Sequence, residues 1–483
     1  MSAAPLSAAP PARRRKIVLY NPRAVFFTMP LALLAIGSEL DPEAYEVVII
    51  DGRLERDPEA AVRAQLADAL CLGITVLTGA PISDALMISR LAKQVRPDLQ
   101  VVWGGWHPSM FARECLQDPS VDVSVRGQGE VTFAEIVARL GEGRSLEGCL
   151  GCTVRLTDGT IVENPPRPLK NVDEFRAHDY RLIPVERYFE LKGKRQLDYI
   201  SSQGCNFRCA FCSDPFVYGR QWVGLEPQRM ALRLRELWER YRFDDVNFQD
   251  ETFFTRARRV QAFAQGLVDA RLQFTWAATM RADQGVRLPE EVWALCKQSG
   301  LRRLLVGVES GSDAMLQRIR KDIRIEQVFR TVDKMLKYGI AGHFPFIVGF
   351  PDETDESIAA TLDCAKRLRA LHADFLTPIY YFKPYPGSEL VREAVARGFQ
   401  LPQTLSAWSQ FDYVAGLPGP WVTPEKYRLI ERFKFFQDLA WKPVVRGRRV
   451  LQQLARYRCS RDEYRWPVEM LLRRWMLPAE KLS

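Results

Sequence analysis

Three cysteines, Cys205, Cys209 and Cys212, stand within eight residues of one another. Their C-x3-C-x2-C spacing lets three thiolates converge on one centre, and thiolates are soft ligands that suit iron–sulfur clusters or zinc. A closed zinc site needs a fourth ligand, here a distant His or Cys. A cluster held by three cysteines instead leaves one iron open to a substrate or cosubstrate. The spacing indicates one of these two centres, and we favour the open cluster.

The other cysteines give weaker signals. Cys149 and Cys152 have C-x2-C spacing beside a predicted turn, and we interpret them as two incidental thiols. Cys71, Cys296 and Cys364 fall in apolar patterns and are predicted to be core residues. Ten cysteines in 483 residues with no secretory signal do not indicate a disulfide framework, so a reducing, cytoplasmic setting is the expectation.

The cysteine motif ends the first strand of a long strand–helix series. The apolar strand segments of this series, each followed by a helical stretch, are residues 197–205, 245–254, 274–282, 301–311, 342–351 and 375–387. Six such repeats predict a partial, TIM-type (β/α)6 barrel over 196–400, with function at the carboxyl ends of the strands.

An earlier series precedes the barrel. Buried-type strands are expected at residues 16–21, 46–51, 69–77, 99–105 and 121–127, with helices between them such as 84–94. Near-continuous apolar strands alternating with helices predict a parallel, Rossmann-like sheet over 15–140, and therefore an α/β fold class. Ligands of such sheets bind at the carboxyl ends of the strands.

The remaining segments are less regular. Residues 1–14 read as a disordered Ala/Pro leader, and 141–195 as a connector with a hairpin around Asp158–Gly159. Residues 401–483 are expected to be helical and basic.

The net charge of +9 comes from 68 Lys+Arg against 59 Asp+Glu, and +7 of it (11 − 4) lies after residue 440. A basic tail on a nearly neutral body argues against a nucleic-acid partner. No apolar run reaches the roughly 18 residues of a membrane span. The stretches 444–458 and 468–477 combine apolar faces with arginines. They predict a packed cap with a solvated basic face, or else a peripheral contact with anionic lipid.

The cysteine spacing, with Phe211 before the last cysteine, resembles the signature of the radical S-adenosylmethionine (SAM) enzymes. The resemblance spans about residues 197–388. It implies a [4Fe–4S] cluster whose open iron is chelated by the amino and carboxylate groups of SAM. One electron then cleaves a C–S bond of SAM, and the resulting 5′-deoxyadenosyl radical takes hydrogen atoms from carbons that no acid or base could activate. Such chemistry suits a barrel that shields the radical from solvent.

Further strand ends resemble the SAM contacts of this family. Asp250 and Glu251 match the position that holds the methionine amino group, and Arg281 is expected to add to the carboxylate contacts. Taken singly, each residue could equally be a helix cap or a strand-end polar group.

Two later strand ends continue the pattern. Glu309 and Ser310 match a position that contacts the ribose and carboxylate, and Gly349 and Pro351 belong to the turn against which adenine packs. The recurrence of such residues at successive strand ends is what favours a cofactor site.

The first strand–helix series resembles the cobalamin-binding domain fused to one class of these enzymes. Glycines and small hydroxyl residues at strand ends let the backbone approach a large planar ring. The residues implied as cobalamin contacts are Asp51, Thr75, Thr78, Gly79, Gly104, Gly105, Trp106 and His107.

One feature departs from many cobalamin proteins. The chain has no Asp-x-His-x-x-Gly loop to place a histidine below the cobalt, and His107 is not in that motif. In the radical enzymes this ligand is commonly missing, so cobalamin is still implied, with a vestigial domain as the alternative. No G-x-G-x-x-G follows the first strand, which disfavours a plain dinucleotide-binding unit.

The leading hypothesis is a cobalamin-dependent enzyme that methylates an unactivated carbon of a small, apolar metabolite or lipid. The alternatives are radical cyclisation, rearrangement or carbon–carbon coupling with the same cofactors, and a non-catalytic metal- or cobalamin-binding protein. The candidate catalytic residues are His343, Tyr381 and Tyr385. An electron donor such as a flavodoxin or a ferredoxin is expected as a partner.

Overall fold

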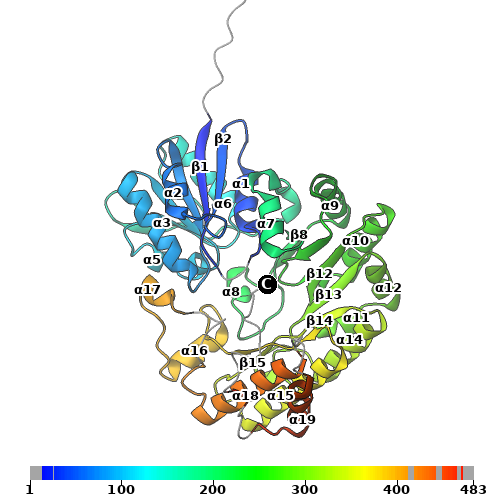
Figure 1. Cartoon of the computed structure of the whole chain (residues 1–483). Helices are drawn as coiled ribbons and strands as arrows, with labels where there is room; N and C mark the ends of the chain where they lie inside the picture. Colours follow the sequence, from blue (N-terminus) through cyan, green and yellow to red (C-terminus); the bar gives the residue numbers. More distant parts are fainter. Residues whose placement is uncertain (1–13, 25–26, 412–417, 442–448, 465–468, 471–483) are drawn as a thin grey trace, which may run out of the picture. The chain divides into compact units, whose positions relative to one another are not determined.

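The computed structural model describes residues 14–24, 27–411, 418–441, 449–464 and 469–470 (Figure 1). The chain divides into two compact units. The first unit contains Met1–Ala24, Ala32–Pro168 and Phe175–Pro184, and the second contains Val25–Leu31, Leu169–Glu174 and Val185–Ser483.

The first unit is built on one seven-stranded sheet with the order β2-β1-β3-β4-β5-β6-β7. Its first five strands run parallel. Strand β6 pairs antiparallel with β5, and β7 pairs antiparallel with β6. The strands are β1 Arg15–Asn21, β2 Tyr45–Asp51, β3 Ala69–Thr75, β4 Gln100–Gly104, β5 Val123–Val125, β6 Cys152–Arg155 and β7 Ile161–Glu163. The helices between them are α1 Leu31–Glu39, α2 Pro58–Arg63, α3 Pro81–Val95, α4 Trp106–Met110, α5 Ala112–Cys115 and α6 Glu130–Gly141.

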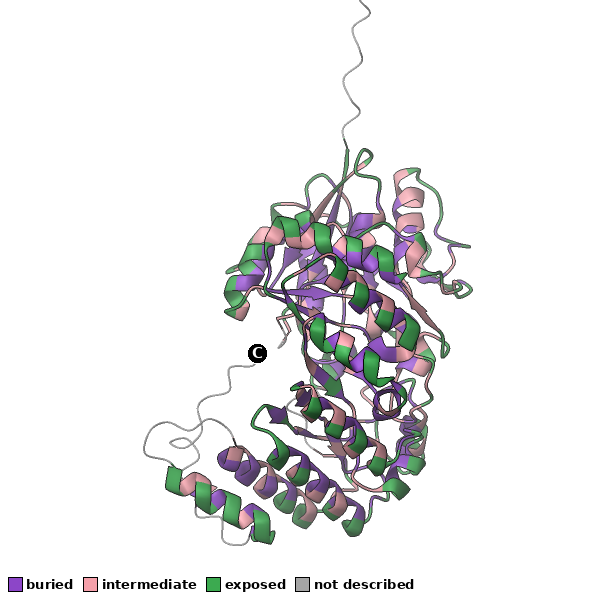
Figure 2. Cartoon of the chain, turned by 90° about the vertical axis from the view of Figure 1, so that its right-hand side faces the viewer, coloured by how far each residue is buried: buried purple, intermediate pink, exposed green. Residues whose placement is uncertain are grey.

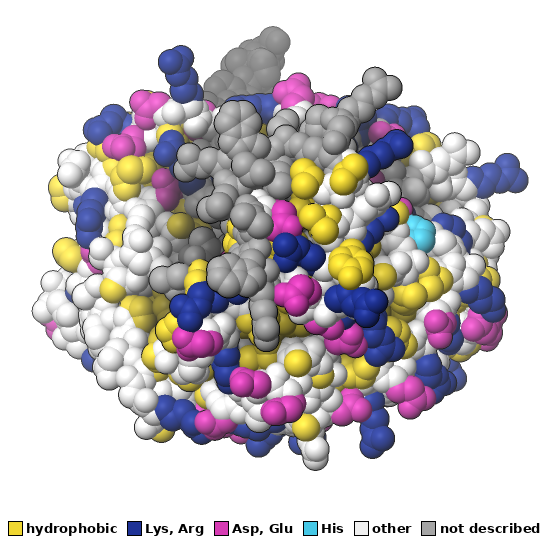
Figure 3. Space-filling view, turned by 60° about the horizontal axis from the view of Figure 1, so that its bottom comes forward, with side chains coloured by type: hydrophobic (Ala, Val, Ile, Leu, Met, Phe, Trp, Pro, Cys, Tyr) yellow, Lys and Arg dark blue, Asp and Glu magenta, His cyan; other side chains and the backbone are white. Residues whose placement is uncertain are grey.

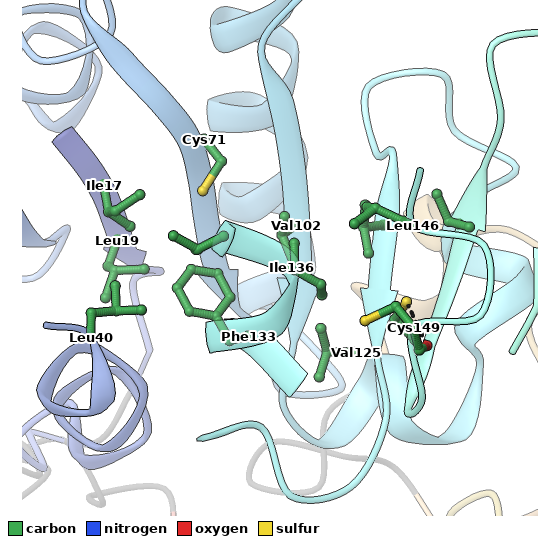
Figure 4. Packing of buried hydrophobic residues seen from close by; sticks show 14 of the residues in the cluster. Ile17, Leu19, Leu40, Cys71, Val102, Val125, Phe133, Ile136, Leu146 and Cys149 are labelled. Atoms are coloured by element: carbon green, nitrogen blue, oxygen red, sulfur yellow. Dashed lines mark hydrogen bonds between the residues drawn. The ribbon is translucent and has the colours of Figure 1, made fainter. Parts of the chain in front are cut away.

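The core of this unit lies between the sheet and its helices (Figure 4). Strands β1 and β3 are buried along almost their whole length because helices cover both faces of a parallel sheet. Phe133 and Ile136 of α6 pack against Leu19 and Val102 in this core. The α/β fold class is confirmed, and the predicted helix 84–94 lies within α3.

The cysteines outside the motif are buried. Cys71, Cys296 and Cys364 are core residues, as predicted. Cys149 and Cys152 belong to the core of the first unit, where the Cys152 thiol donates to the carbonyl of Cys149 at 3.3 Å (Figure 4).

The hairpin expected near Asp158–Gly159 is the β6–β7 pair. It extends the first unit's sheet beyond residue 140, where the sequence indicated only a connector. Pairing of β6 with β5 satisfies backbone groups that would otherwise form an exposed sheet edge. The 3-10 turn Tyr180–Leu182 also belongs to this unit.

The second unit contains a six-stranded, all-parallel sheet with the order β16-β14-β13-β12-β11-β8. A separate parallel pair, β15–β17, continues the series, and β9 pairs antiparallel with β10. The strands are β8 Gln196–Tyr199, β9 Ser202–Gly204, β10 Trp222–Gly224, β11 Asp245–Phe248, β12 Thr275–Met280, β13 Leu301–Val306, β14 Ala341–His343, β15 Phe346–Val348, β16 Phe375–Leu376 and β17 Ile379–Tyr381.

Three of the six strands expected in the barrel are interrupted. Segment 342–351 is divided into β14 and β15 around Pro345, and segment 375–387 into β16 and β17 around Pro378. Proline has no N–H to donate to a neighbouring strand, which accounts for both breaks. Segment 197–205 is divided into β8 and β9 because the chain turns to pair with β10.

Helices cover one side of this sheet, with buried inner and exposed outer faces (Figure 2). Those of the barrel series are α7 Val185–Lys192, α8 Asp214–Val217, α9 Pro227–Tyr241, α10 Ala257–Asp269, α11 Ala282–Arg287, α12 Glu290–Gln298, α13 Asp313–Arg318, α14 Ile325–Lys337, α15 Asp355–Leu371 and α16 Glu389–Ala396. Short 3-10 turns occur at Val172–Glu174 and Phe253–Thr255. One early segment also belongs here, because the Met29 amide donates to Asp198 Oδ2 of β8 at 2.8 Å.

The C-terminal region is helical where it is described, with α17 Leu405–Trp408, α18 Pro424–Trp441 and α19 Arg449–Arg461. Helix α18 lies against α15 and α19. The predicted helix 444–458 is described only from 449, and all of 468–477 except 469–470 lies outside the described residues. None of the described helices is both long and apolar enough to cross a membrane. At this end of the molecule, basic side chains lie among hydrophobic and acidic ones (Figure 3).

Candidate active site

The three motif cysteines lie in the loop that follows β9, and all three are free thiols. The Cys212 amide donates to the Cys209 carbonyl at 3.2 Å, which turns the loop back on itself. Burial raises the pKa of Cys205 to about 11, and Cys209 adds to that shift. Burial likewise raises the pKa of Cys212, to which both other thiols contribute.

This donor set fits an iron–sulfur cluster. It offers three soft ligands in one loop and no fourth cysteine in the same loop. Among the described residues, no group of three His, Cys, Asp or Glu side chains is arranged to hold a metal ion.

Arg281 places a positive charge beside the cysteine loop. It stands at the end of β12, as the N-cap of α11, and its NH1 lies 3.7 Å from the Cys209 sulfur. Its guanidinium stacks 3.8 Å above the ring of Phe207, inside the motif. A nearby cation favours the thiolate form, which is the form that binds iron.

A second cation, Lys321, joins this group. Its Nζ donates to Glu309 Oε1 at 2.8 Å, and its carbonyl accepts from Arg281. Burial lowers the pKa of Lys321, but Glu309 and Cys209 raise it by more, so the amine is held in its charged form. Lys321 lies in the turn after α13 and carries no motif in the sequence.

The structure separates Asp250 from Glu251, which the sequence treats alike. The Asp250 carboxylate accepts from the amide of Ser201 at 3.1 Å and from the hydroxyls of Ser201 and Ser202. Its bonding capacity is largely used inside the protein. Glu251, by contrast, has a buried Oε2 with no hydrogen-bond partner among the described residues.

A second buried carboxyl lies near Glu251. Asp214 Oδ1 is buried and lacks a partner in the described structure, and burial raises the pKa of Asp214 to about 6. Burial also raises the pKa of Glu251 well above its usual range, with the charge of Asp214 adding to the shift. Two buried carboxyl groups that each have one oxygen without a partner in the described structure suit a cationic ligand such as an ammonium group.

Glu309 and Ser310 each have a partner inside the protein. Glu309 has a left-handed backbone, with φ of 68°, which is strained for a residue other than glycine. Its carbonyl accepts from Ile347 at 2.7 Å, and this bond helps to hold the conformation that directs its carboxylate to Lys321. The fully buried Ser310 hydroxyl lies 3.0 Å from Thr361 Oγ1, so it has a partner within the fold.

The turn Gly349-Phe350-Pro351 is held by an acidic residue that follows it. Glu353 Oε2 accepts from the amides of Gly349 at 2.6 Å and Phe350 at 3.2 Å. On the other side, Trp421 Nε1 donates to the Gly349 carbonyl at 2.6 Å. The Phe350 ring packs edge-to-face on Phe211 of the cysteine motif.

The three candidate catalytic residues have different surroundings. The Tyr381 hydroxyl donates to Glu431 Oε1 of α18 at 3.0 Å, which gives it a structural partner. Tyr385 packs edge-to-face on Phe411. Burial and the nearby Arg303 lower the pKa of His343 to about 4, so this imidazole is neutral near pH 7.

In the first unit, the candidate cobalamin residues lie at or just after the carboxyl ends of β2, β3 and β4. Asp51 is already engaged, because its carboxylate accepts from Asn21 Nδ2 at 3.1 Å and from Arg53 Nε at 2.9 Å. Thr75 is the last residue of β3, and Gly79, with φ of 107°, allows the sharp turn that leads into α3.

The segment after β4 depends on close backbone approach. Gly105 has φ of 98°, and a Cβ there would lie 3.0 Å from Thr75 Oγ1 and 3.1 Å from the Val76 amide. At Gly104 a Cβ would meet only Val125, at 3.7 Å. Gly105 is therefore required by the fold itself, whereas Gly104 leaves open space of the kind that a flat ligand could use.

His107 follows Trp106 in the first turn of α4. Its amide donates to the Val76 carbonyl at 3.0 Å, and its Nδ1 lies 3.1 Å from Thr78 Oγ1. Burial lowers the pKa of His107 to about 4, so the ring is neutral near pH 7. The structure thus brings together Thr78 and His107, two residues that the sequence placed after different strands.

Several residues of the site were missed from the sequence. Three of them belong to no sequence motif: Lys321, Glu353 and Trp421. Glu353 binds backbone amides of the preceding turn, and the other two bind partners that lie earlier in the chain. Asp214 had one available signal, since it lies two residues after the last cysteine of the motif.

Two family models match the chain. The radical SAM superfamily matches residues 199–365, and the B12 binding domain matches residues 18–137. An uncharacterised methyltransferase of Pyrococcus horikoshii is 33% identical over 402 residues, which cover 82% of this chain and 85% of the relative. The chain belongs to the cobalamin-dependent radical SAM enzymes, as its motifs indicated. It is an enzyme whose family cofactors are a [4Fe–4S] cluster, SAM and cobalamin.

Other relatives differ in their reactions. The cytidylyl-2-hydroxyethylphosphonate methyltransferase of Streptomyces wedmorensis is 25% identical, covering 87% of this chain and 89% of its own. The anaerobic magnesium-protoporphyrin IX monomethyl ester cyclase of Rubrivivax gelatinosus is 26% identical, and the match covers 72% of this chain and 63% of the cyclase. Among solved structures, the radical SAM methyltransferase TsrM of Kitasatospora setae has a TM-score of 0.74 at 18% identity, covering 88% of this chain and 90% of that one. At this identity the similarity shows the fold.

Proposed function

We propose that the enzyme transfers a methyl group from SAM, by way of cobalamin, to an unactivated carbon of a small, apolar metabolite or lipid. The observation that carries this proposal is the similarity to a methyltransferase at 33% identity through both domains. When bound, the cluster supplies the electron that cleaves SAM to a 5′-deoxyadenosyl radical, while cobalamin carries the methyl group.

In this proposal, Cys205, Cys209 and Cys212 hold the cluster, and the protein's own charges position SAM. The unpartnered carboxylate oxygen of Glu251 accepts from the methionine ammonium. Arg281 attracts the methionine carboxylate and, through its contact with Cys209, keeps that carboxylate beside the cluster.

The other side of the SAM site is shaped by backbone. Glu353 fixes the amides of Gly349 and Phe350, so the turn offers a rigid, apolar surface to adenine. Glu309, held by Lys321, is placed to accept from the ribose hydroxyls. Ser310 and Asp250 support these groups, since their polar atoms bond within the protein.

For cobalamin, we propose that Gly104 admits the ring and that Trp106 and His107 border it. The neutral His107 is held by Thr78 and by its own backbone amide, which supports a role as a fixed hydrogen-bonding group beside the ring. Asp51, Thr75 and Gly79 shape the strand ends around this segment.

The test uses anaerobically reconstituted full-length protein with SAM, a strong reductant and hydroxocobalamin. Mass spectrometry measures S-adenosylhomocysteine and 5′-deoxyadenosine, with Cys209→Ala as the control. Formation of both products supports methyl transfer. If protein of confirmed iron content forms neither product, the non-catalytic alternative is favoured.

A second candidate is radical cyclisation, rearrangement or carbon–carbon coupling, which the similarity to the cyclase favours. In this case the same assay yields 5′-deoxyadenosine without S-adenosylhomocysteine. The two candidates are therefore separated by one product.

We further propose two partners. A flavodoxin or ferredoxin reduces the cluster, and a mixture with either protein should replace the chemical reductant. The outer face of α19 carries the exposed side chains Val450, Leu454 and Tyr457, with Arg449 and Arg461 beside them. This combination supports peripheral contact with anionic lipid. Flotation with phosphatidylglycerol vesicles, but not with phosphatidylcholine vesicles, is the expected result, and Leu454→Glu should reduce it.

A further inference from the structure

The strands of the second unit's sheet have two different faces. Residues that point toward the helices, such as Trp276, Leu304 and Phe375, are fully buried. The opposite face, which we call the inner face, is partly open to water. On it Leu305 is 37% exposed and Leu376 is 38% exposed. These two leucines give this face of the sheet an accessible apolar surface on which an apolar ligand can pack.

Register shows which residues share this face. Thr279, Leu305, His343 and Leu376 are successive partners across β12, β13, β14 and β16, so they form one row. The neutral imidazole of His343 adds a hydrogen-bonding group to this row without adding charge.

Arg303 lies on the same face, two residues before Leu305 on β13. Its neighbours across the sheet are Ala277 of β12 and Ala341 of β14. Its Nε is buried and has no hydrogen-bond partner among the described residues. A buried guanidinium nitrogen without an acceptor is costly, and an anionic ligand would satisfy it.

The neighbouring charges leave this end of the face cationic. Asp245 is engaged by Arg302 Nε at 2.6 Å and by Thr275 Oγ1 at 2.7 Å. Burial and Arg302 together lower the pKa of both Lys194 and Arg303, which shows how closely the cations are grouped. The other nearby carboxylate, Asp374, has a side chain that is 68% exposed, so water screens its charge.

We propose that the inner face binds an amphiphilic substrate whose apolar body lies on Leu305 and Leu376 and whose terminal carboxylate or phosphate-type group binds Arg303. This inference rests on the proposed function and names its substrate class. The positive charge of Arg303 selects the anionic group of the substrate, and the two leucines of the row select its apolar part.

The spacing also orients that substrate. Arg303 is the third residue of β13, and Glu309, at the SAM end of the same segment, follows the end of that strand by three residues. The strand from Arg303 to Val306 alone is roughly 10 Å long. The anionic group and the reacting carbon therefore lie at opposite ends of the substrate. A compact polar metabolite would not span this distance.

The test measures binding to the anaerobically reconstituted full-length enzyme by calorimetry. The probes are hexylphosphonate, hexanoate, hexanol and inorganic phosphate. We expect hexylphosphonate or hexanoate to bind at least about 10-fold more tightly than hexanol or phosphate, since a charge-assisted hydrogen bond is worth that much or more. The two anions distinguish a phosphate-type head group from a carboxylate. Equal binding of hexanol and both anions would overturn the proposal.

Variants locate the site. Arg303→Gln should weaken binding of the preferred anion about 10- to 100-fold, with hexanol unaffected. Arg303→Lys should recover part of the loss, and Arg330→Gln, on the exposed face of α14, should cause none. Leu305→Glu provides a second variant at an already exposed position and should weaken binding of every alkyl probe. Retained anion binding in Arg303→Gln would also overturn the proposal.

Failure of this inference is distinguishable from failure of the proposed function. Probe binding is measured without turnover, whereas methyl transfer is read from S-adenosylhomocysteine. If the enzyme forms S-adenosylhomocysteine but does not bind the anionic probes, the proposed methyl transfer stands and the proposed substrate class is wrong.

Discussion

The two units offer different chemistry at their candidate ligand sites. At the strand ends of the first unit, the side chains of Asp51 and Thr78 already have partners inside the protein, and the open space comes from a glycine. At the strand ends of the second unit, buried oxygens of Glu251 and Asp214 lack partners in the described structure. One candidate site is built from backbone shape and the other from buried carboxyl oxygens without partners. Substitutions should therefore affect the first mainly through fit and folding, and the second through ligand affinity.

The largest effect is expected at the cysteine motif. Cys209→Ala removes one of the three proposed cluster ligands, so cluster absorbance, iron content and SAM cleavage should all be lost, the last by more than about 100-fold. Cys149→Ala is the matched control, because that thiol is buried in the core of the first unit. A Cys209→Ala protein that keeps its iron would contradict this role.

The charge of the SAM site is tested by Glu251→Gln, which keeps the shape and removes the carboxylate. We expect SAM to bind about 10- to 100-fold more weakly, because a charge-assisted hydrogen bond to the ammonium becomes a neutral one. Iron content should stay unchanged. Equilibrium dialysis with labelled SAM measures the effect, and Glu291→Gln, at an exposed position of α12, serves as the control. Unchanged affinity would assign the ammonium to another group.

The first unit should respond to shape. Gly105→Ala forces a residue with Cβ into φ of 98° and against the Val76 backbone, so it should cost about 2–3 kcal/mol of stability. Gly104→Ala should cost little stability, yet weaken cobalamin binding if the ring lies against it. Urea unfolding and cobalamin titration separate the two effects. If Gly104→Ala and Gly105→Ala lower the free energy of unfolding equally, the two glycines do not have the different roles assigned to them.

A smaller effect comes from the protonation of His107. Its pKa in the folded protein is lowered to about 4, so the stabilisation is complete above the unfolded value near 6.5 and is lost as pH falls toward 4. Between pH 7 and pH 5 the residue should account for a loss of about 2 kcal/mol. Urea unfolding at both pH values measures it.

His107→Gln should flatten the pH dependence, and His372→Gln, at an exposed position, should not. Parallel pH profiles for the wild type and His107→Gln would show that the ring is solvated in the folded protein.

Local signals made much of this molecule predictable. The cysteine spacing, the strand periodicity and the position of Glu251 are all contained in short segments of sequence. The breaks at Pro345 and Pro378 had a local signal as well, since proline cannot complete a ladder of hydrogen bonds. The sequence pattern joined the apolar runs on either side of each proline and so overstated the strand lengths.

What could not be predicted depends on partners far along the chain. Asp250 and Glu251 are adjacent acidic residues, and only the serines of another strand end show that the first is satisfied and the second is not. Lys321 acquires its role from Glu309, and the hairpin β6–β7 joins the first sheet because β5 would otherwise be its edge. Hydrogen-bond satisfaction is a property of the tertiary structure, and no local pattern reports it.

The bond from the Met29 amide to Asp198 has a consequence for biosynthesis. Its donor and acceptor are 169 positions apart, and the segment that carries Met29 belongs to the second unit although it is translated with the first. At about 5–20 residues per second, a ribosome needs roughly 10–30 s to supply the acceptor. Until then the Met29 amide lacks this acceptor, so the segment that carries Met29 can take its final position only after the first strand of the barrel has been translated.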